Sequence, residues 1–365
     1  MRVLFSSLGT HGHTYPLLPL ARAARAVGHE VVFATDASLA PALAGLEAVE
    51  AGASIREVFG QLPAEFAEKR DLLTMQAEVF GSALPRRFYA DLVPIVERLR
   101  PDLVVHEYGN PGAGLAALAA GVPALCHGFG FATNGFEVAA ERFGQVAAEL
   151  GFDVPASFLL GNRLIDVCPP SLRTSSDEVV DLRLVPFAEP GEVVLPEGDR
   201  PLVYLTLGTA FGSVEVLRTA ITGLAALDVR LLVSTGPTVD AGQFADVPDN
   251  VLIRSWVPQA DLLRHVDLVV HHGGSGTTLG AMVDGVPQLV LPQGADQFTN
   301  TAVVEKAGVG EGLQGDDVTA EAVGTRARAL LADEAVRDAA RALAAEIAAM
   351  PSPEDVARRL PDYAG

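Results

Sequence analysis

Short apolar segments alternate with helical patterns along the chain, and this alternation restricts the fold more than any other feature of the sequence. The pattern over 17–29 has apolar residues at helical spacing and Gly28 as a helix end. Strands that are apolar on both faces and are followed by helices are typical of a parallel sheet covered on both sides. The predicted strands of the first half are 2-RVLFSS-7, 30-EVVFAT-35, 102-DLVVHE-107 and 123-PALCHG-128.

The second half repeats the scheme after a linker. Residues 186–201 contain four prolines, two glycines and several acidic residues. The sequence therefore predicts an α/β protein with two doubly wound domains. The later strands are 202-LVYLTLG-208, 229-VRLLVSTG-236, 251-VLIRSWV-257, 267-DLVVHH-272 and 287-PQLVLPQ-293.

Domain boundaries follow from these elements. We predict a first domain at 1–190, a second at 191–350, and a final helix at 351–365 that returns to the first domain. Residues 56–98 have helical spacing without a strand pattern, so we predict an insertion over the first sheet. Ligands of such sheets bind beyond the carboxyl ends of the strands, so we expect the site in a cleft between the domains.

Charge and cysteine content limit the partners and the compartment. The formal net charge of −20 creates a field that repels nucleic acid and anionic membrane surfaces, so an anionic ligand must be met by local groups. Cys126 and Cys168 lie in apolar strand-like contexts, which predicts core thiols and a reducing cytoplasm. We expect no signal peptide and no membrane span, and we find no Asp-x-Asp metal motif.

The segment 271-HHGGSGTTLG-280 follows a predicted strand and begins a helix. Its glycines let the main chain approach a ligand closely, and a helix N-terminus presents unpaired N–H groups and partial positive charge. The imidazole of His272 and the hydroxyls of Ser275 and Thr277 add side-chain donors, which together suit a diphosphate. The alternative is a tight strand–helix turn with a threonine cap and histidines that bind only backbone.

Two other segments carry polar or aromatic side chains beside predicted strands. Asp296, Gln297 and Asn300 form a group that can hydrogen-bond several hydroxyls, and the alternative is loop solvation with Asp296 as a helix cap. Trp256, the only tryptophan, precedes Gln259. An aromatic face with nearby amides can stack on a base and recognise it, and the alternative is a core anchor.

The order of these features resembles the donor-binding motif of nucleotide-sugar glycosyltransferases with the GT-B fold, in the branch that glycosylates natural products. The resemblance covers the whole chain in outline. It implies two Rossmann-like domains around a deep cleft, with the base on Trp256, the diphosphate at His272, and the sugar at Asp296 and Gln297. The implied donor-site residues are Thr209, Trp256, Val257, Gln259, His272, Gly274, Ser275, Gly276, Thr277, Asp296 and Gln297.

One departure from the family pattern concerns the donor. In members that use UDP-sugars, a glutamate eight residues after the motif histidine binds the ribose hydroxyls, whereas this chain has Gly280 there. A donor that lacks the ribose 2′-hydroxyl does not need this carboxylate. The departure favours a dTDP-sugar, and dTDP usually carries 6-deoxyhexoses in antibiotic pathways.

The first predicted strand leads to a candidate base in 8-LGTHGHTYP-16. Histidine titrates near neutrality and suits removal of a proton from a hydroxyl, especially when a carboxylate orients it. From the residues alone, His11, His13 and Glu107 also fit helix capping and turn polarity. In the resembled family the base is the histidine three residues before the proline, which is His13. Its partner, usually Asp, falls on Glu107, and the longer side chain leaves the geometry of the pair open.

The resemblance implies an inverting, metal-independent transfer of a deoxysugar from a dTDP-sugar to a hydroxyl of a natural product. The N-terminal sequence 9-GTHGHTYPLLPLARAARAVGHEV-31 looks especially like that of actinobacterial transferases of enediyne antibiotics such as calicheamicin. We expect segments 56–90 and 127–145 to line a hydrophobic acceptor pocket, and we leave a homodimer open. The phenylalanines that can pack a flat acceptor there, or simply fill a core, are Phe129, Phe131, Phe136 and Phe143.

Two other functions remain as alternatives. A GT-B sugar-nucleotide epimerase or hydrolase predicts additional acidic and basic residues near the diphosphate, but the chain has only two lysines, Lys69 and Lys306. A catalytically silent, nucleotide-binding partner protein predicts loss of the base pair or of the phosphate histidine. This chain keeps all three residues.

Overall fold

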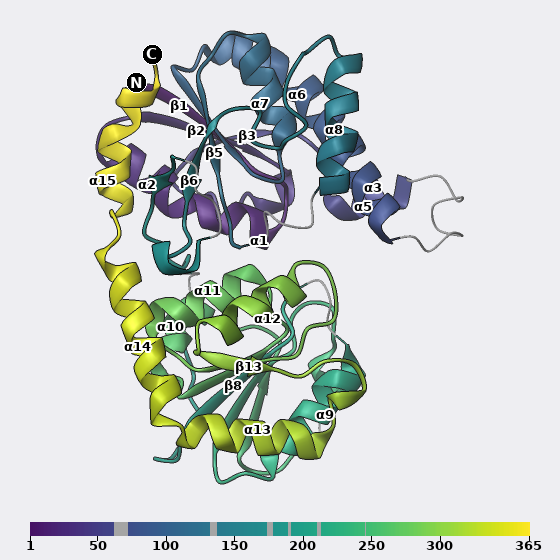
Figure 1. The fold of residues 1–365 in the computed structure, drawn as a ribbon, viewed down its shortest axis with the longest axis vertical. Helices are drawn as coiled ribbons and strands as arrows, with labels where there is room; N and C mark the ends of the chain where they lie inside the picture. Colours follow the sequence, from purple (N-terminus) through teal and green to yellow (C-terminus); the bar gives the residue numbers. More distant parts are fainter. Residues whose placement is uncertain (62–71, 132–136, 174–177, 189–190, 210–212, 245) are drawn as a thin grey trace. The chain divides into compact units, whose positions relative to one another are not determined.

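The computed structural model describes residues 1–365 except 62–71, 132–136, 174–177, 189–190, 210–212 and 245. The chain forms two compact units, each with its own parallel sheet (Figure 1). Unit 1 comprises Met1–Val167, Thr174–Arg183 and Met350–Gly365, and unit 2 comprises Cys168–Arg173 and Leu184–Ala349. None of the described helices is long and apolar enough to span a membrane.

The sheet of unit 1 has the strand order β3-β2-β1-β4-β5-β6-β7, with parallel neighbours throughout. The four strands predicted in this half are present, and three short strands were not predicted. One of these, with sequence EAVE, lacks an apolar run, and another has only two residues. The strands are β1 Arg2–Ser6, β2 Glu30–Thr35, β3 Glu47–Glu50, β4 Leu103–Glu107, β5 Ala124–His127, β6 Arg163–Asp166 and β7 Val180–Asp181.

Helices cover this sheet, and one of them corrects the predicted insertion at 56–98. The described part of that segment is helical, as predicted, but Phe88 and Leu92 of α6 are buried in one core with Leu4, Val32 and Val104 of the strands. This helix is therefore part of the layer that covers the sheet. The helices are α1 His11–Thr14, α2 Leu18–Ala26, α3 Ile55–Gln61, α5 Leu72–Glu78, α6 Leu84–Leu99, α7 Pro111–Ala119, α8 Glu137–Glu149 and α15 Pro353–Arg359.

The sheet of unit 2 has the order β10-β9-β8-β11-β12-β13, again parallel. Alternate residues of β8 face opposite layers: Val203 and Leu205 pack with α9 and α13, whereas Tyr204 packs with α10 and α11. The strands are β8 Leu202–Thr206, β9 Arg230–Ser234, β10 Val251–Arg254, β11 Leu268–His271, β12 Gln288–Val290 and β13 Gly310–Gly312. The helices are α9 Val214–Ala225, α10 Gln259–Leu262, α11 Ser275–Asp284, α12 Gln297–Lys306, α13 Ala320–Ala332 and α14 Glu334–Ala349.

Each sheet has a point where the strand order reverses. In unit 1 this point lies between β1 and β4, and in unit 2 it lies between β8 and β11. Loops diverge at such a point, and open α/β sheets bind their ligands there, at the carboxyl ends of the strands. The topology alone therefore marks one candidate site in each unit.

Candidate active site

A histidine and a carboxylate meet at the reversal point of unit 1. His13 lies in α1, directly after β1, and Glu107 is the last residue of β4. His13 Nδ1 lies 2.9 Å from Glu107 Oε1, and the two side chains are 15% and 0% exposed. The backbone N–H of Gly109 donates to the same oxygen at 2.5 Å. The longer glutamate thus reaches the histidine, and with Nδ1 donating to it, Nε2 carries the lone pair that can accept a proton.

Local contacts hold the loop that carries His13. Thr14 Oγ1 donates to the carbonyl of Leu8 at 3.0 Å. Gly9 approaches Asp36 so closely that a Cβ on the glycine would lie 2.3 Å from Asp36 Cβ. The position of the imidazole is therefore set by a turn that tolerates little displacement.

The two histidines nearest in sequence, His11 and His106, have other contacts than the His13–Glu107 pair. The ring of His11 packs edge-on against Tyr15, with centroids 5.1 Å apart. His106 is fully buried, burial lowers its pKa to about 4, and Asn162 Nδ2 lies 3.1 Å from its Nε2. Because successive strand residues point to opposite faces, His106 faces away from the side chain of Glu107.

The four phenylalanines predicted for the acceptor pocket differ in their surroundings. Phe131 and Phe143 are buried, and Phe143 packs edge-on against Phe158 in the core. Phe129 is partly exposed, and its ring centroid lies 4.8 Å from that of His13. Phe136 lies outside the described residues.

In unit 2, the two histidines after β11 differ in their contacts. The N–H of Gly273 donates to His271 Nδ1 at 3.1 Å, and His271 Nε2 lies 2.9 Å from Gln288 Oε1. Burial lowers the pKa of His271 to about 3. His271 is thus a neutral structural residue that satisfies the backbone, the role that the sequence left open for both histidines.

His272 lies between two stretches of backbone. A Cβ on Gly208 would lie 2.4 Å from His272 Cε1, and a Cβ on Gly274 would lie 2.5 Å from Nε2. Burial lowers the pKa of His272 to about 4, partly opposed by the nearby Asp296, so the ring is neutral at pH 7. Its Nδ1 is buried and has no hydrogen-bond partner among the described residues.

Backbone amides dominate the start of α11. The N–H groups of Thr277 and Thr278 donate to the carbonyl of Gly274, so those of Ser275 and Gly276 precede the first helical bond. An anion is favoured at this position by these amides and by the helix dipole.

The hydroxyls of this turn have partners within the protein. Ser275 Oγ donates to Asp296 Oδ2 at 2.9 Å, and Thr277 Oγ1 donates to Gln259 Oε1 at 3.2 Å. Both hydroxyl hydrogens are thus given to protein oxygens. Among the described residues, the backbone amides and His272 remain as anion donors of this turn, and contacts from Ser275 and Thr277 to a ligand stay a prediction.

The group after β12 also differs from the expected loop. Gln297 and Asn300 belong to α12 and are buried. Gln297 Oε1 accepts the N–H groups of Gln293 and Gly294 at 2.7 and 3.1 Å. The amide of Asn300 donates to Asp296 Oδ2 at 3.0 Å and to other atoms of the turn, so Asn300 holds the scaffold together.

The predicted base-binding residues divide into exposed and packed groups. Trp256 is 41% exposed, which argues against a core anchor, whereas Val257 is buried in the core beside α10. Gln259 Oε1 accepts the hydroxyls of Thr277 and, at 3.4 Å, Tyr204. Thr209 directly follows Gly208 and is partly buried.

Gly280, the position that departs from the UDP-sugar pattern, is buried within α11. A Cβ there would lie 3.1 Å from Leu263 Cδ1. Close packing against Leu263 therefore favours glycine at this position, independently of whether the donor needs a ribose-binding carboxylate.

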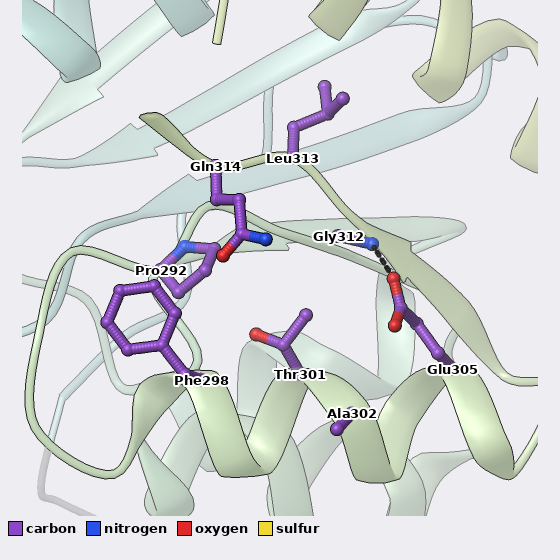
Figure 2. A pocket seen from close by; sticks show the side chains of 8 residues that line it. All are labelled: Pro292, Phe298, Thr301, Ala302, Glu305, Gly312, Leu313 and Gln314. Carbon is purple, nitrogen blue, oxygen red and sulfur yellow. Dashed lines mark hydrogen bonds between the residues drawn. The ribbon is translucent and has the colours of Figure 1, made fainter. Parts of the chain in front are cut away.

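A pocket of about 260 Å³ lies along α12 and beside β13 (Figure 2). Gly312 N–H donates to Glu305 Oε1 at its rim. The predicted donor-site residues do not line it, although Phe298, the residue after Gln297, does. Its lining residues are Pro292, Phe298, Thr301, Ala302, Glu305, Gly312, Leu313 and Gln314. Within the described residues, no three or more His, Cys, Asp or Glu side chains are grouped to hold a metal ion.

Two glycines of the site were missed in the sequence. Gly109 packs on the His13–Glu107 pair, and Gly208, with φ of +75°, packs on His272. Each follows the end of a central strand by two residues. That placement was the available signal, because glycine after such a strand permits close approach of backbone to a neighbour.

The chain matches two family models. The Erythromycin biosynthesis protein CIII-like N-terminal domain matches residues 22–208, and the corresponding C-terminal domain matches residues 218–362. The Elloramycin glycosyltransferase ElmGT of Streptomyces olivaceus is 35% identical, over 99% of this chain and 97% of that protein. The L-demethylnoviosyl transferase of Streptomyces niveus is 34% identical, over 99% and 97%.

Solved structures show the same architecture. The Streptomyces sp. SF2575 glycosyltransferase SsfS6, complexed with thymidine diphosphate, matches with a TM-score of 0.81 at 28% identity, over 99% of each chain. Spinosyn rhamnosyltransferase SpnG, complexed with thymidine diphosphate, matches with a TM-score of 0.82 at 26% identity, over 99% of this chain and 100% of that chain.

Proposed function

The chain belongs to the EryCIII-like family of antibiotic glycosyltransferases with the GT-B fold, and we propose that it transfers a deoxysugar from a dTDP-sugar to a hydroxyl of a polyketide-type natural product with inversion. The proposal assigns acceptor activation to unit 1 and donor binding to unit 2. The observation that carries it is the 2.9 Å contact between His13 Nδ1 and Glu107 Oε1.

The chemistry is a single displacement. His13 Nε2 takes the proton of the acceptor hydroxyl, and Glu107 stabilises the imidazolium that results. The acceptor oxygen attacks the anomeric carbon from the face opposite the diphosphate, and the bond from that carbon to the phosphate oxygen breaks. The products are a glycoside with inverted configuration and a nucleoside diphosphate.

Donor binding rests on the turn before α11. The amides of Ser275 and Gly276, the helix dipole and His272 supply donors for the leaving diphosphate, so the proposed transfer needs no metal ion. The proposal places the sugar at Asp296 and Gln297. For Gln297 it uses the Nε2 end of the amide, because Oε1 holds the loop.

The thymidine nucleotide is proposed on two grounds. Gly280 provides no carboxylate for a ribose 2′-hydroxyl, and thymidine diphosphate occupies the solved structures of SsfS6 and SpnG. The proposal includes stacking of the base on Trp256, a residue that is 41% exposed.

The experiment is a calorimetric titration of the full chain with dTDP and with UDP. We expect tighter binding of dTDP than of UDP. His272→Ala should bind dTDP more weakly, and His13→Ala should bind it as the wild type does but abolish transfer. Tighter binding of UDP would refute the assigned nucleotide, and binding of neither would refute the donor site.

Two narrower expectations remain predictions. The enediyne acceptor is not named by the relatives described above. Cys126 and Cys168 are both buried, as predicted for core thiols, and we propose a reducing cytoplasm as the compartment.

A further inference from the structure

Two phenylalanines border the base of unit 1. The ring of Phe80 is stacked on the imidazole of His13, with centroids 6.5 Å apart and planes 27° apart. The ring of Phe129 is 4.8 Å away and tilted by 55°. Both phenylalanines are partly exposed, so aromatic carbon from two separate segments borders the group that takes the proton.

Phe80 lies in an unusual helical turn. Residues Val79–Ala83 form a π-helix between α5 and α6. Turns of this kind are rare and frequently occur at functional sites, because the inserted residue changes which side chains face a neighbour. The turn therefore decides whether Phe80 faces His13.

Helix α8 holds this turn in place, beside α5 (Figure 1). A Cβ on Gly81 would lie 2.3 Å from the carbonyl oxygen of Ala139, so the turn and α8 are in backbone contact. Arg142 of α8 donates to Glu78 Oε1 at 2.7 Å and to Ser82 Oγ at 3.2 Å, on both sides of Phe80. The backbone on both sides of Phe80 is thus held by contacts that do not involve His13.

Phe80 and Phe129 belong to a larger group of aromatic side chains in unit 1. Phe80 and Phe129 pack against a buried cluster that includes Tyr108, Phe143 and Phe158. Aromatic pairs attract one another beyond the effect of buried area, in offset-stacked or edge-to-face arrangements. A saturated molecule of the same size gains only the burial.

We propose that Phe80 is a specificity-determining residue and that the acceptor is a planar aromatic phenol, held by Phe80 and Phe129 with its hydroxyl at His13. This inference rests on the proposed function, because it takes His13 as the base that faces the acceptor. The phenolic proton passes to His13, and the phenolic oxygen forms the bond to the sugar.

The test compares two alcohols with the same fused bicyclic skeleton, 2-naphthol and decahydro-2-naphthol. Each is titrated calorimetrically into the full chain saturated with dTDP. We expect 2-naphthol to bind roughly tenfold more tightly, the effect of one or two aromatic contacts. Hydrophobic burial alone predicts no such preference, since the saturated alcohol is at least as apolar.

Variants separate the role of Phe80 from a structural one. Phe80→Leu should remove most of the preference, and Phe80→Tyr, which keeps the ring, should retain it. The matched control is Phe152→Leu, because Phe152 pairs with Tyr89, at 5.8 Å, in the same cluster. It should leave the preference unchanged.

The possible outcomes distinguish failure of the aromatic-acceptor inference from failure of the proposed transferase function. If dTDP binds but the wild type binds the two alcohols equally or not at all, the aromatic acceptor is wrong and the donor site stands. An unchanged preference in Phe80→Leu also overturns the role of Phe80. If dTDP itself does not bind, the proposed function fails and the inference fails with it.

Discussion

Glu107 Oε1 is shared by two donors: His13 Nδ1 lies 2.9 Å away, and the N–H of Gly109 lies 2.5 Å away. A carboxylate held in this way orients the imidazole and stabilises its protonated form. Its second oxygen is buried, and no described residue forms a hydrogen bond with it. The pair is therefore fixed by a single carboxylate oxygen.

Glu107→Gln tests the charge of this pair, because glutamine keeps one oxygen for both contacts. We expect kcat to fall by about 100- to 10,000-fold, since the imidazolium loses its counter-charge. The Kd of dTDP should be unchanged in calorimetry. His11→Ala is the control, and it should leave kcat nearly as in the wild type. Normal turnover in Glu107→Gln would exclude the pair from the mechanism.

Gly109→Ala tests the geometry of the pair without changing its chemistry. The added methyl group would lie 3.0 Å from Glu107 Oε1 and 3.1 Å from His13 Cε1, which forces a shift of a few tenths of an ångström. We expect kcat to fall about tenfold, because small displacements of reacting groups are costly. Gly12→Ala is the matched control, since a Cβ at Gly12 meets no atom of the described part of the chain within 4 Å. Equal turnover of the two variants would contradict the prediction.

Gly274→Ala tests whether the donor site depends on the position of His272. The methyl group would lie 2.5 Å from His272 Nε2, so the ring must move. We expect the Kd of dTDP to rise roughly tenfold, about 1.4 kcal/mol. In a His272→Ala background the same substitution should have little further effect, because the obstructed ring is gone. Additive losses in this cycle would show that Gly274 acts independently of His272.

Buried histidines predict a loss of stability in mild acid. Burial lowers the pKa values of His106 and His127 to about 4 and that of His271 to about 3. The unfolded chain binds these protons near pH 6.5, and the folded chain binds them only near pH 3 to 4. Stability is thus complete above pH 6.5 and decreases as the pH falls towards 4. Each histidine should contribute a loss of about 1 kcal/mol between pH 7 and 5.5.

Calorimetric unfolding between pH 7 and 5.5 measures this effect as a falling Tm. The control is His265→Gln, which changes an exposed histidine and should leave the pH dependence as it is. A Tm that stays constant over this interval would show that these histidines take up protons without unfolding.

The sequence predicted the central strands well, because β1, β4, β8 and β11 are apolar on both faces. It missed β13, a Gly-Glu-Gly strand at the sheet edge. These residues have low strand propensity, and the strand is recognised by its backbone pairing with β12. The π-helix at Val79–Ala83 was also missed, since its distortion depends on contacts with α8, far along the chain. Local sequence patterns identify strands and helices whose own residues are apolar enough to be buried. They miss elements that form only through contacts with segments distant in the sequence.

The candidate site shows the same division. His13, Glu107 and His272 could be singled out because polar residues after buried strands are uncommon and their family positions are specific. The use of the hydroxyls of Ser275 and Thr277 by Asp296 and Gln259 could not be predicted, because it depends on side-chain distances between separate loops. The role of Gly109 could not be predicted either, because it depends on the close approach of His13 and Glu107 to its backbone.

The last helix gives unit 1 a discontinuous sequence. Helix α15 packs on α2, and its Val356 and Ala357 are buried. The carbonyl of Ala357 accepts a hydrogen bond from His29 at 3.0 Å. A chimaera made by a single crossover near residue 184 would therefore combine the first sheet of one parent with a covering helix of another. Exchange of the donor half between relatives requires a second crossover near residue 350, so that each recombined unit keeps the helix with which its surface evolved.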